Sequence, residues 1–450
     1  MKSLEQLHEI CERMRKVVQL REENAKEILE KAAMCESGKD ADGNTYRTHV
    51  LVCGGTGCTS SGSARIRERL EKEIEANGLS DEVCVVKTGC FGLCALGPIM
   101  IVYPEGTFYS MVQEEDIPEI VTEHLLKGNV VKHLLYEETV KADKIIPLNE
   151  TNFYKKQHRV ALRNCGVINP EKIDEYIGTG GYEALGIVLT EKKPEDVIQI
   201  LLDSGLRGRG GAGFPTGLKW KFAAGNDADQ KYVCCNADEG DPGAFMDRSI
   251  LEGDPHAVLE AMAIAGYAIG ASQGYIYVRA EYPIAVQRLE IAIEQAREYG
   301  LLGKNIFDSG FDFDIELRLG AGAFVCGEET ALMTSIEGNR GEPRPRPPFP
   351  ALKGLFQKPT IAWLVAFILL YKVGRSFPRS LYIKGQVTLL AGTSISARPF
   401  TFTTLSLPEK VSNPCLIKYP ITNMPIARMT ASSFQLFILQ LFLVIQLFVL

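Results

Sequence analysis

The stretch that decides the fold is Gly205-Leu206-Arg207-Gly208-Arg209-Gly210-Gly211-Ala212-Gly213-Phe214-Pro215-Thr216-Gly217-Leu218-Lys219-Trp220. It holds six glycines within thirteen residues, two arginines before the Gly-Gly pair and a lysine after it. Glycine lets backbone N–H groups converge on an anion and lets a large planar ligand approach the main chain. A flexible surface loop is the alternative, but such a linker would alternate Gly with Ser, whereas this stretch leads directly into aromatic residues. We interpret it as a phosphate cradle.

Length and composition limit the possible architectures and functions. A chain of 450 residues, 46% of them hydrophobic, is predicted to hold about three domains at roughly 150 residues each. The formal net charge of -7 gives no indication of a nucleic-acid partner. No apolar signal region follows Met1, so the sequence predicts a cytoplasmic protein whose twelve cysteines are more suited to metal ligation than to disulfides.

Residues 1–46 are predicted to form an N-terminal helical segment. Apolar residues recur at three- and four-residue spacing from Leu4 to Leu29, with charged residues between them. This pattern predicts a helix that packs one face against a neighbouring domain.

Two pairs of cysteines lie in Gly-rich loops, Cys53 with Cys58 and Cys90 with Cys94. Each pair follows an apolar run that predicts a strand, 48–52 and 83–87, and a helix is predicted between them over 63–77. Four thiolates on such loops suit an iron–sulfur cluster, because glycines let amide N–H groups point at the sulfur atoms. Structural zinc is the alternative, but zinc pairs usually have two-residue gaps and often include histidine. The spacing therefore favours a cluster.

This arrangement resembles the thioredoxin-like 2Fe-2S ferredoxins. That family ends in a Gly-Pro-containing turn and two strands, which Gly97-Pro98 and the residues up to Tyr109 fit, and 114–128 fits a closing helix. The resemblance implies a ferredoxin domain over 47–138 that binds a 2Fe-2S cluster through the four cysteines. Residues 139–200 would connect it to the next domain.

Three further motifs follow the cradle. The first, Tyr232 to Phe245, runs from a predicted strand into an acidic turn containing Asn-Ala-Asp-Glu. The second, Gly320 to Leu332, is a Gly-rich turn followed by two glutamates and a predicted helix, and the third is the proline-locked Arg344-Pro345-Arg346-Pro347-Pro348-Phe349-Pro350. In open α/β sheets, ligands bind at the carboxyl ends of the strands, so the acidic turn is a candidate for a binding edge.

In this order the motifs resemble the flavoprotein subunit of NADH dehydrogenases of the complex I type, and more closely the fused beta subunits of multimeric NAD(P)-linked iron hydrogenases. The resemblance covers residues 1–360 and implies an α/β fold: a thioredoxin-like ferredoxin domain, then a Rossmann-like FMN/NAD-binding domain over 201–360. It implies an oxidoreductase subunit in which a hydride passes from NADH to FMN and single electrons pass on to iron–sulfur clusters.

The resemblance also implies the site residues. The cofactor-binding residues would be Gly208, Arg209, Gly210, Gly211, Gly213, Phe214, Lys219, Phe222, Asn236, Asp238, Glu239, Gly327, Glu328, Glu329 and Phe349. Among them Phe214, Phe222 and Phe349 would hold the adenine ring, and Glu239 and Glu329 would lie near the nicotinamide nucleotide as the catalytic residues. Expected partners are other subunits of a hydrogenase or NADH dehydrogenase complex, including a small thioredoxin-like 2Fe-2S subunit, with no nucleic acid and no membrane contact.

Two alternatives to this function remain open on the sequence alone. A carboxylate at Glu239 would repel the 2′-phosphate of NADPH, which favours NADH, but an NADP-linked hydrogenase subunit is the alternative. The other is a non-catalytic electron-transfer or assembly subunit, whose 2Fe-2S domain works while the flavin site stays empty.

Residues 361–450 differ sharply from the rest of the chain. They hold one acidic residue, Glu409, against eight basic ones, and Cys415 is their only cysteine. The related subunits continue instead with a β-grasp domain and a helical domain whose four cysteines bind a 4Fe-4S cluster, so we expect that cluster to be absent. A frameshift or chimaeric join is favoured over a membrane anchor, because the apolar run 434–450 is shorter than the ~20 residues needed to span a bilayer. An unfamiliar genuine domain is the third possibility. We expect the tail to be poorly ordered and prone to aggregation.

Overall fold

The computed structural model describes residues 1, 3–21, 46–141, 144–146, 148–210 and 212–364. All of these belong to one compact unit, Met1–Ile395; the second unit, Ser396–Leu450, lies outside the described residues. The predictions about 365–450 therefore concern residues that are not described. Within the described ranges, none of the helices combines the length and the hydrophobicity that a bilayer crossing requires.

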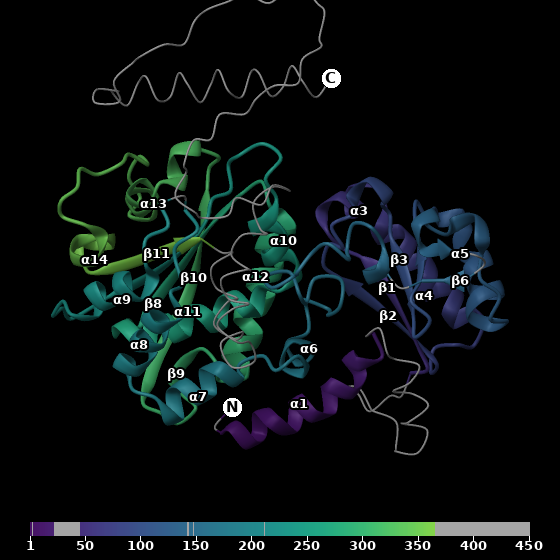
Figure 1. Cartoon of the computed structure of the whole chain (residues 1–450), viewed down its shortest axis with the longest axis horizontal. Helices are drawn as coiled ribbons and strands as arrows, with labels where there is room; N and C mark the ends of the chain where they lie inside the picture. The colour runs from purple at the N-terminus through teal and green to yellow at the C-terminus, as the bar shows by residue number, and fades with distance from the viewer. Residues whose placement is uncertain (2, 22–45, 142–143, 147, 211, 365–450) are drawn as a thin grey trace, which may run out of the picture. The chain divides into compact units, whose positions relative to one another are not determined.

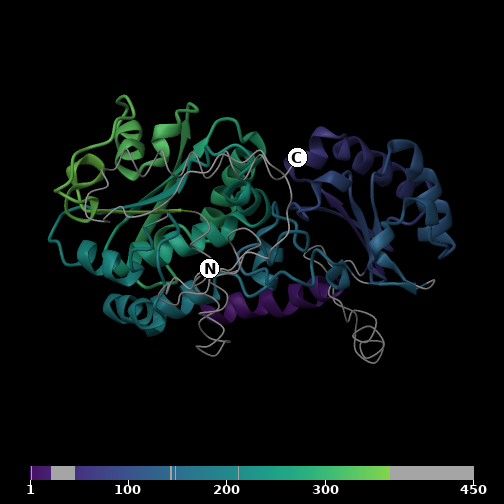
Figure 2. The ribbon, with the colours of Figure 1, turned by 45° about the horizontal axis from the view of Figure 1, so that its top comes forward.

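The predicted N-terminal helix is present as α1, Leu4–Gln19, which Figure 2 shows in purple as one continuous helix. The Ser3 side chain caps it by accepting a hydrogen bond from the Gln6 N–H at 3.4 Å. Its buried face includes Leu7, Cys11 and Met14 and packs against α6, Ile173–Gly178. The continuation of the predicted helix to Leu29 lies outside the described residues.

Residues 46–126 form the ferredoxin-like part of the structure. Its helices and strands are β1 (Thr48–Cys53), α3 (Thr56–Ser60), α4 (Ser63–Ala76), β2 (Val83–Thr88), η1 (Cys94–Leu96), β3 (Met100–Tyr103), β4 (Thr107–Tyr109), η2 (Glu114–Asp116), α5 (Ile117–Glu119) and η3 (Ile120–Leu126). The sheet order is β2-β1-β3-β4, with β1 parallel to β2 and the other two pairs antiparallel. Both cysteine loops follow strands, β1 and β2, that end at the same edge of this sheet.

The connecting region is made of short pieces followed by helices. They are η4 (Lys132–Leu134), η5 (Glu137–Thr139), β5 (Val140–Lys141), β6 (Lys144–Ile145), η6 (Leu148–Glu150), α6, α7 (Glu183–Glu191) and α8 (Pro194–Ser204). Helix α8 starts with Pro194 and stops at Gly205, whose φ of 67° is left-handed and favours glycine. The glycine cradle thus begins where a helix must end.

The second sheet belongs to the α/β domain that contains the cradle. The elements are α9 (Thr216–Ala224), β7 (Tyr232–Ala237), α10 (Met246–Gly253), α11 (Pro255–Ile269), β8 (Gln273–Arg279), α12 (Pro283–Glu298), β9 (Gly303–Ile306), β10 (Phe311–Gly320), η7 (Phe324–Gly327), α13 (Glu329–Ile336), α14 (Pro350–Lys353), η8 (Leu355–Gln357) and β11 (Thr360–Leu364). The strand order is β11-β7-β8-β10-β9, and every neighbouring pair is parallel except β10 with the edge strand β9. Figure 1 labels β8, β9, β10 and β11 of this sheet.

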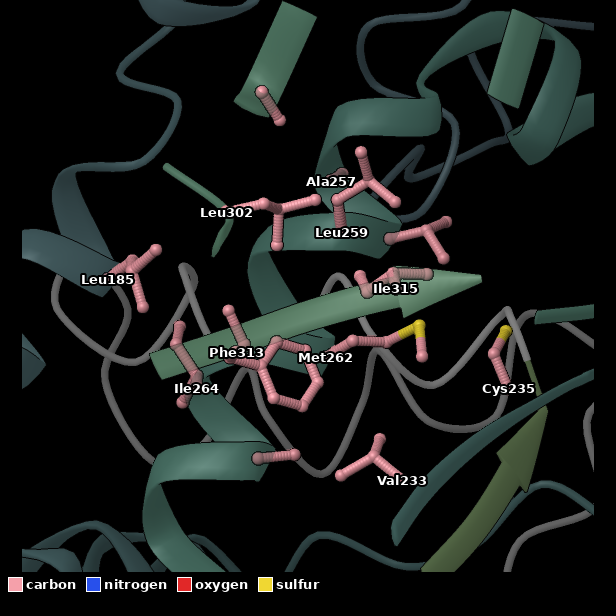
Figure 3. Close-up of a cluster of buried hydrophobic side chains, with 14 of the residues drawn as sticks. Leu185, Val233, Cys235, Ala257, Leu259, Met262, Ile264, Leu302, Phe313 and Ile315 are labelled. Carbon is pink, nitrogen blue, oxygen red and sulfur yellow. The ribbon is translucent and has the colours of Figure 1, made fainter. Parts of the chain in front are cut away.

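Both faces of this sheet are buried, which explains why β7 reads as a continuous apolar run. Val233 and Cys235 point into the larger core, where α11 packs and its Met262 lies beside Phe313 of β10 (Figure 3). Cys234, between them, belongs to a separate cluster with side chains of α13. A parallel sheet covered on both faces leaves its carboxyl edge as the place for a ligand.

Strand β11 extends the sheet beyond the domain boundary placed at residue 360. Ile361 pairs with Val233 in register and is fully buried, and Ala362 pairs with Cys234. The family-like sheet therefore includes at least four residues that the change in composition had assigned to the tail.

Candidate functional site

The glycine cradle forms a closed loop between α8 and α9. The Gly208 N–H donates to the Phe214 carbonyl at 2.8 Å, and the Thr216 N–H donates to the Leu206 carbonyl at 3.0 Å. Gly217 lies so close to α8 that a Cβ there would be 2.7 Å from the Leu202 nitrogen. The loop is therefore fixed at both ends, and the N-terminus of α9, which has no side-chain cap, opens beside it.

A cavity of about 670 Å³ lies against this loop, within the size range of small-molecule sites. Twelve predicted residues line it: Gly208, Arg209, Gly210, Gly213, Phe214, Lys219, Phe222, Asn236, Gly327, Glu328, Glu329 and Phe349. The three phenylalanines are 46%, 52% and 61% exposed in that order, so their rings are accessible to a ligand. Of the other predicted residues, Gly211 lies outside the described residues, and Asp238 and Glu239 do not line the cavity.

Charged side chains from three segments meet at one side of the cavity. The Lys219 Nζ donates to Glu329 Oε2 at 2.7 Å and to the Ala362 carbonyl at 2.8 Å. Arg346 pairs with both Glu328 and Glu329. Arg346 belongs to the proline-rich motif but was not predicted as a site residue, because nothing in the local sequence shows which carboxylates it reaches.

Glu328 also begins α13. Its carboxylate accepts hydrogen bonds from the N–H groups of Thr330 at 2.8 Å and Ala331 at 3.0 Å. Burial acts to raise the pKa of Glu328, but these hydrogen bonds and the Arg346 charge outweigh it, so its pKa is lowered. Glu328 is therefore ionised, and its main contacts are structural.

The acidic turn after β7 places Asn236, Asp238 and Gly327 together. The Asn236 amide donates to the Gly327 carbonyl at 2.8 Å, and a Cβ at Gly327 would lie 3.5 Å from the Asp238 carbonyl oxygen. Both carboxylate oxygens of Asp238 are buried without a hydrogen-bond partner among the described residues, and the Arg279 guanidinium faces them from 3.9 Å. Burial raises the pKa of Asp238 against the influence of Arg279. Two unsatisfied buried acceptors call for a donor that the described residues do not supply.

These unsatisfied groups fit an FMN molecule. The ribityl hydroxyls of FMN could donate hydrogen bonds to the Asp238 carboxylate, which has no donor among the described residues. Thr216 Oγ1 and Trp220 Nε1, both on the cavity-lining helix α9, are also buried without a partner in the described part of the chain. The aromatic and apolar lining suits a planar ring system. The residues present are therefore compatible with the predicted cofactor.

Glu239 has a different setting from the one predicted. Its carboxylate accepts hydrogen bonds from the N–H groups of Met246 at 2.8 Å, Asp247 at 3.2 Å and Arg248 at 3.2 Å, at the start of α10. It thus caps a helix, and its role toward a nucleotide stays a prediction.

The four predicted cluster cysteines come together at the edge of the first sheet. Cys53 contacts the thiols of both Cys58 and Cys90, and Cys90 Sγ lies 3.6 Å from Cys94 Sγ. Two glycines make this approach possible, since a Cβ at Gly55 would lie 2.8 Å from Cys90 Cβ and one at Gly97 would lie 2.7 Å from Cys58 Sγ. The four sulfurs form one continuous group.

Crowding shifts the acidity of these thiols. Hydrogen bonding with Cys58 raises the pKa of Cys53 to about 12, and hydrogen bonding with Cys53 raises the pKa of Cys90 to about 11. The pKa of Cys94 is raised through Cys90, and that of Cys58 is lowered through Cys53. A 2Fe-2S cluster fits this donor set, because two ferric ions supply the positive charge that four adjacent thiolates need. No three His, Cys, Asp or Glu side chains of the described ranges surround a single ion position.

Polar contacts hold the first cysteine loop against the α/β domain. Glu252 of α10 accepts from the Thr56 N–H at 3.0 Å and from the Thr56 hydroxyl. Arg288 of α12, which is fully buried, donates to the Gly54 carbonyl at 3.0 Å. Sequence reasoning did not identify Glu252 or Arg288, because their partners lie about 200 residues away in the chain.

Comparison with known proteins agrees with both resemblances. Residues 201–362 match the family model described as the Nuo51 FMN-binding domain, and residues 42–125 match that of the thioredoxin-like 2Fe-2S ferredoxins. The predicted families are therefore confirmed for both domains.

Three relatives illustrate the match over different lengths. The chain is 67% identical over 211 residues to the NADP-reducing hydrogenase subunit HndC of Solidesulfovibrio fructosivorans, covering 47% of this chain and 43% of that protein. It is 56% identical over 189 residues to an NADH-quinone oxidoreductase subunit of Aquifex aeolicus, covering 42% and 44%. It is 35% identical over 342 residues to the alpha subunit of the NAD-reducing hydrogenase HoxS of Cupriavidus necator, covering 74% and 54%. The chain thus spans about half the length of these curated relatives.

Proposed function

We propose that this protein is the NAD(P)H-oxidising subunit of a multisubunit oxidoreductase of the hydrogenase or NADH dehydrogenase type. The chain joins a thioredoxin-like 2Fe-2S ferredoxin domain to a Nuo51-type FMN-binding domain, which is the combination such a subunit needs. The observation that carries the proposal is the cavity of about 670 Å³ that gathers twelve predicted residues from the cradle, α9, β7, the 320–332 motif and the proline-rich motif. When bound there, FMN would accept a hydride from the nicotinamide and release electrons one at a time.

The residues of the cavity divide into two groups with different tasks. Phe214, Phe222 and Phe349 present exposed rings between which an adenine can stack. Asn236 and Lys219 line the inner part with an amide and a cation, and the unsatisfied carboxylate of Asp238 lies beside Gly327 of the lining; together they suit the ribityl and ring polar groups of FMN. Together they bind and orient; no general acid or nucleophile is required of them.

Glu329 is the predicted catalytic residue that lines the cavity. Its two carboxylate oxygens are engaged by Lys219 and Arg346 at 2.7 and 3.1 Å. We propose that Glu329 positions these two cations at the nucleotide side of the cavity. Glu239 acts on the same region indirectly, by fixing the start of α10.

The four cysteines would hold the 2Fe-2S cluster and the chain would pass electrons between its two domains. Glu252 and Arg288 fix the cysteine loop against helices of the α/β domain, so the two redox sites belong to one packed unit. Expected partners are the remaining subunits of such an assembly, among them a small thioredoxin-like 2Fe-2S subunit, and we propose a cytoplasmic location without membrane contact.

The nucleotide preference has two candidates. A carboxylate at Glu239 favours NADH, whereas the relative with 67% identity is named as a subunit of an NADP-reducing hydrogenase. Comparison of NADH and NADPH oxidation before and after Glu239→Gln separates them. If the Glu239→Gln variant oxidises NADPH at the same rate as the unsubstituted chain, Glu239 does not select the nucleotide.

The proposed function is tested by measuring the cofactor content of the purified chain. Bound FMN, iron and acid-labile sulfide are measured after anaerobic purification. We expect one FMN and one 2Fe-2S cluster per chain. Iron and sulfide without any retained FMN, even after incubation with added FMN, would instead favour the non-catalytic electron-transfer subunit, and zinc in place of iron would overturn the cluster assignment.

A further inference from the structure

A second cavity, of about 660 Å³, lies away from the FMN cavity and shares no lining residue with it. Its walls come from α1 and the residues just after it, the β3–β4 turn of the ferredoxin domain around Glu105, and the connecting region from Tyr154 to Thr179, with Phe91 and Leu148 completing the lining. The proposed function assigns no role to this cavity.

Arginines dominate the charged groups of this second cavity. Arg15, Arg21, Arg159 and Arg163 line it, and Glu105 is the single acidic residue among its described lining. Arg21 is neutralised, since its guanidinium pairs with the buried Glu175 at 2.6 Å. The other three form no ion pair with a carboxylate in the described part of the chain.

Within the described ranges, these three arginines make few hydrogen bonds. Arg15 Nη2 contacts the Cys11 sulfur at 3.3 Å, and Arg159 donates a hydrogen bond to the Cys165 carbonyl at 3.0 Å. Arg163 Nη2 is buried and has no hydrogen-bond partner in the described residues. A buried guanidinium donor without a partner is unfavourable, because it has lost its hydrogen bonds to water without gaining one in the protein.

The walls of the cavity are aromatic and rigid. The Arg159 guanidinium lies over the Tyr154 ring at 5.2 Å, and the Tyr154 hydroxyl donates to the Phe91 carbonyl. Gly166, with a left-handed φ of 82°, packs on Phe91 so tightly that a Cβ would lie 2.5 Å from the ring. Phe91 lies between Cys90 and Cys94 in the sequence, so a ligand here would also contact the cluster loop.

We propose that this cavity binds a phosphate-bearing anion of nucleotide size. Guanidinium groups recognise phosphate oxygens through paired hydrogen bonds, and three of them facing one cavity match a ligand with more than one negative charge. The volume exceeds the need of a single phosphate, and the lining includes the aromatic side chains of Phe91, Tyr103 and Tyr154, of which Phe91 and Tyr154 are buried. A set of solvated arginines would not explain why the Arg163 donor is buried.

The test is calorimetric titration of the cofactor-loaded full chain with pyrophosphate and, separately, with ADP. The variant is Arg159→Gln with Arg163→Gln. The matched control is Arg69→Gln with Arg340→Gln, which removes the same charge from exposed positions paired with Glu73 and Glu342. ADP binding at the FMN cavity is expected in all three proteins, so only binding that differs between variant and control is assigned to this cavity.

We expect the control to bind pyrophosphate as the unsubstituted chain does and the variant to bind it at least about tenfold more weakly. Variant-sensitive binding that is tighter for ADP than for pyrophosphate would identify a nucleotide as the ligand, and equal affinity would show that the phosphate groups suffice. Equal binding of both probes by variant and control would overturn the proposal.

If the Arg159→Gln, Arg163→Gln variant folds poorly, a melting-temperature measurement on the unsubstituted chain and on a more conservative variant still tests the proposal. Pyrophosphate is expected to raise the melting temperature of the unsubstituted chain, and Arg163→Lys, which keeps the charge but loses the paired donors, is expected to reduce that rise. If pyrophosphate leaves the melting temperature of the unsubstituted chain unchanged, the cavity is not an anion site. This result is independent of the FMN content that tests the proposed function.

Discussion

The two redox domains of this chain build their sites in opposite ways. In the ferredoxin domain, four identical side chains come from two loops less than fifty residues apart, and their sulfurs form one group. In the α/β domain, the cavity draws on residues from Gly208 to Trp363, and its charged groups are neutralised by one another through Lys219, Glu329 and Arg346. The cysteine site is defined by the chemistry of its four thiol ligands, whereas the cavity of the α/β domain is defined by how the sheet and its loops are arranged.

The largest effect is expected from removing one donor of the first site. Cys90→Ala takes away one of four thiolates, so bound iron and sulfide should fall at least about tenfold while FMN content stays unchanged. Cys84→Ala, in strand β2 and outside the sulfur group, is the control. If Cys90→Ala retained the full iron and sulfide content, the four thiolates would not define the first site, and its contrast with the cavity of the α/β domain would be lost.

Removing one member of the charged network should have a smaller effect on the second site. Lys219→Gln deprives Glu329 of its closest cation, so the Kd of FMN should rise about tenfold, with iron content unchanged. Lys221→Gln on the same helix α9, which is exposed, is the matched control. Equal FMN affinity in the two variants would mean that the network around Lys219 does not hold the cofactor.

Removing an aromatic ring at the rim of the cavity should weaken NADH binding without changing FMN binding. Phe349→Ala removes one stacking surface, which predicts a several-fold to about tenfold higher KM for NADH at constant FMN content. Phe324, which is exposed but does not line the cavity, provides the control Phe324→Ala. Loss of FMN from Phe349→Ala would show that the rim and the cofactor site are not separate.

The smallest effect concerns α10, which contacts the cysteine loop and follows the acidic turn of the second site. Glu239→Ala removes the cap of α10, so the free energy of unfolding should fall by about 1 kcal/mol, measured by denaturant titration. Glu342→Ala, at an exposed position, is expected to change it by less. An unchanged free energy in Glu239→Ala would show that the three hydrogen bonds do not stabilise α10.

The sequence predicted the first site more completely than the second for a physical reason. Cys53 ends β1 and Cys58 follows it in α3, while Cys90 and Cys94 follow β2. Because β1 and β2 are parallel and end at one sheet edge, the local spacing was enough to predict that the four cysteines come together. Ala362 and Trp363 line the cavity of the α/β domain only because the chain returns to it, with β11 pairing to β7 across more than 120 residues. Local sequence carries no signal for such pairing, and the change of composition after Thr360 concealed it.

Glu239 shows a second limit of sequence reasoning. The acidic turn follows strand β7, as predicted, but a carboxylate there has two possible uses, toward a ligand or toward the next helix. The N–H groups at the start of α10 engage Glu239, while Asp238 beside it keeps both oxygens unsatisfied within the described part of the chain. Backbone geometry, not residue type, decides which of Asp238 and Glu239 binds the helix N–H groups and which keeps its carboxylate free of hydrogen bonds.

The decisive measurement is an anaerobic absorption spectrum of the purified, FMN-loaded chain during titration with NADH. We expect the flavin absorption to be bleached by about one equivalent of NADH, since we propose that this cavity holds the nicotinamide ring and the flavin in one place. Bound flavin that NADH and NADPH both fail to bleach would contradict the proposed function, and the chain would then be an electron carrier rather than the nucleotide-oxidising subunit.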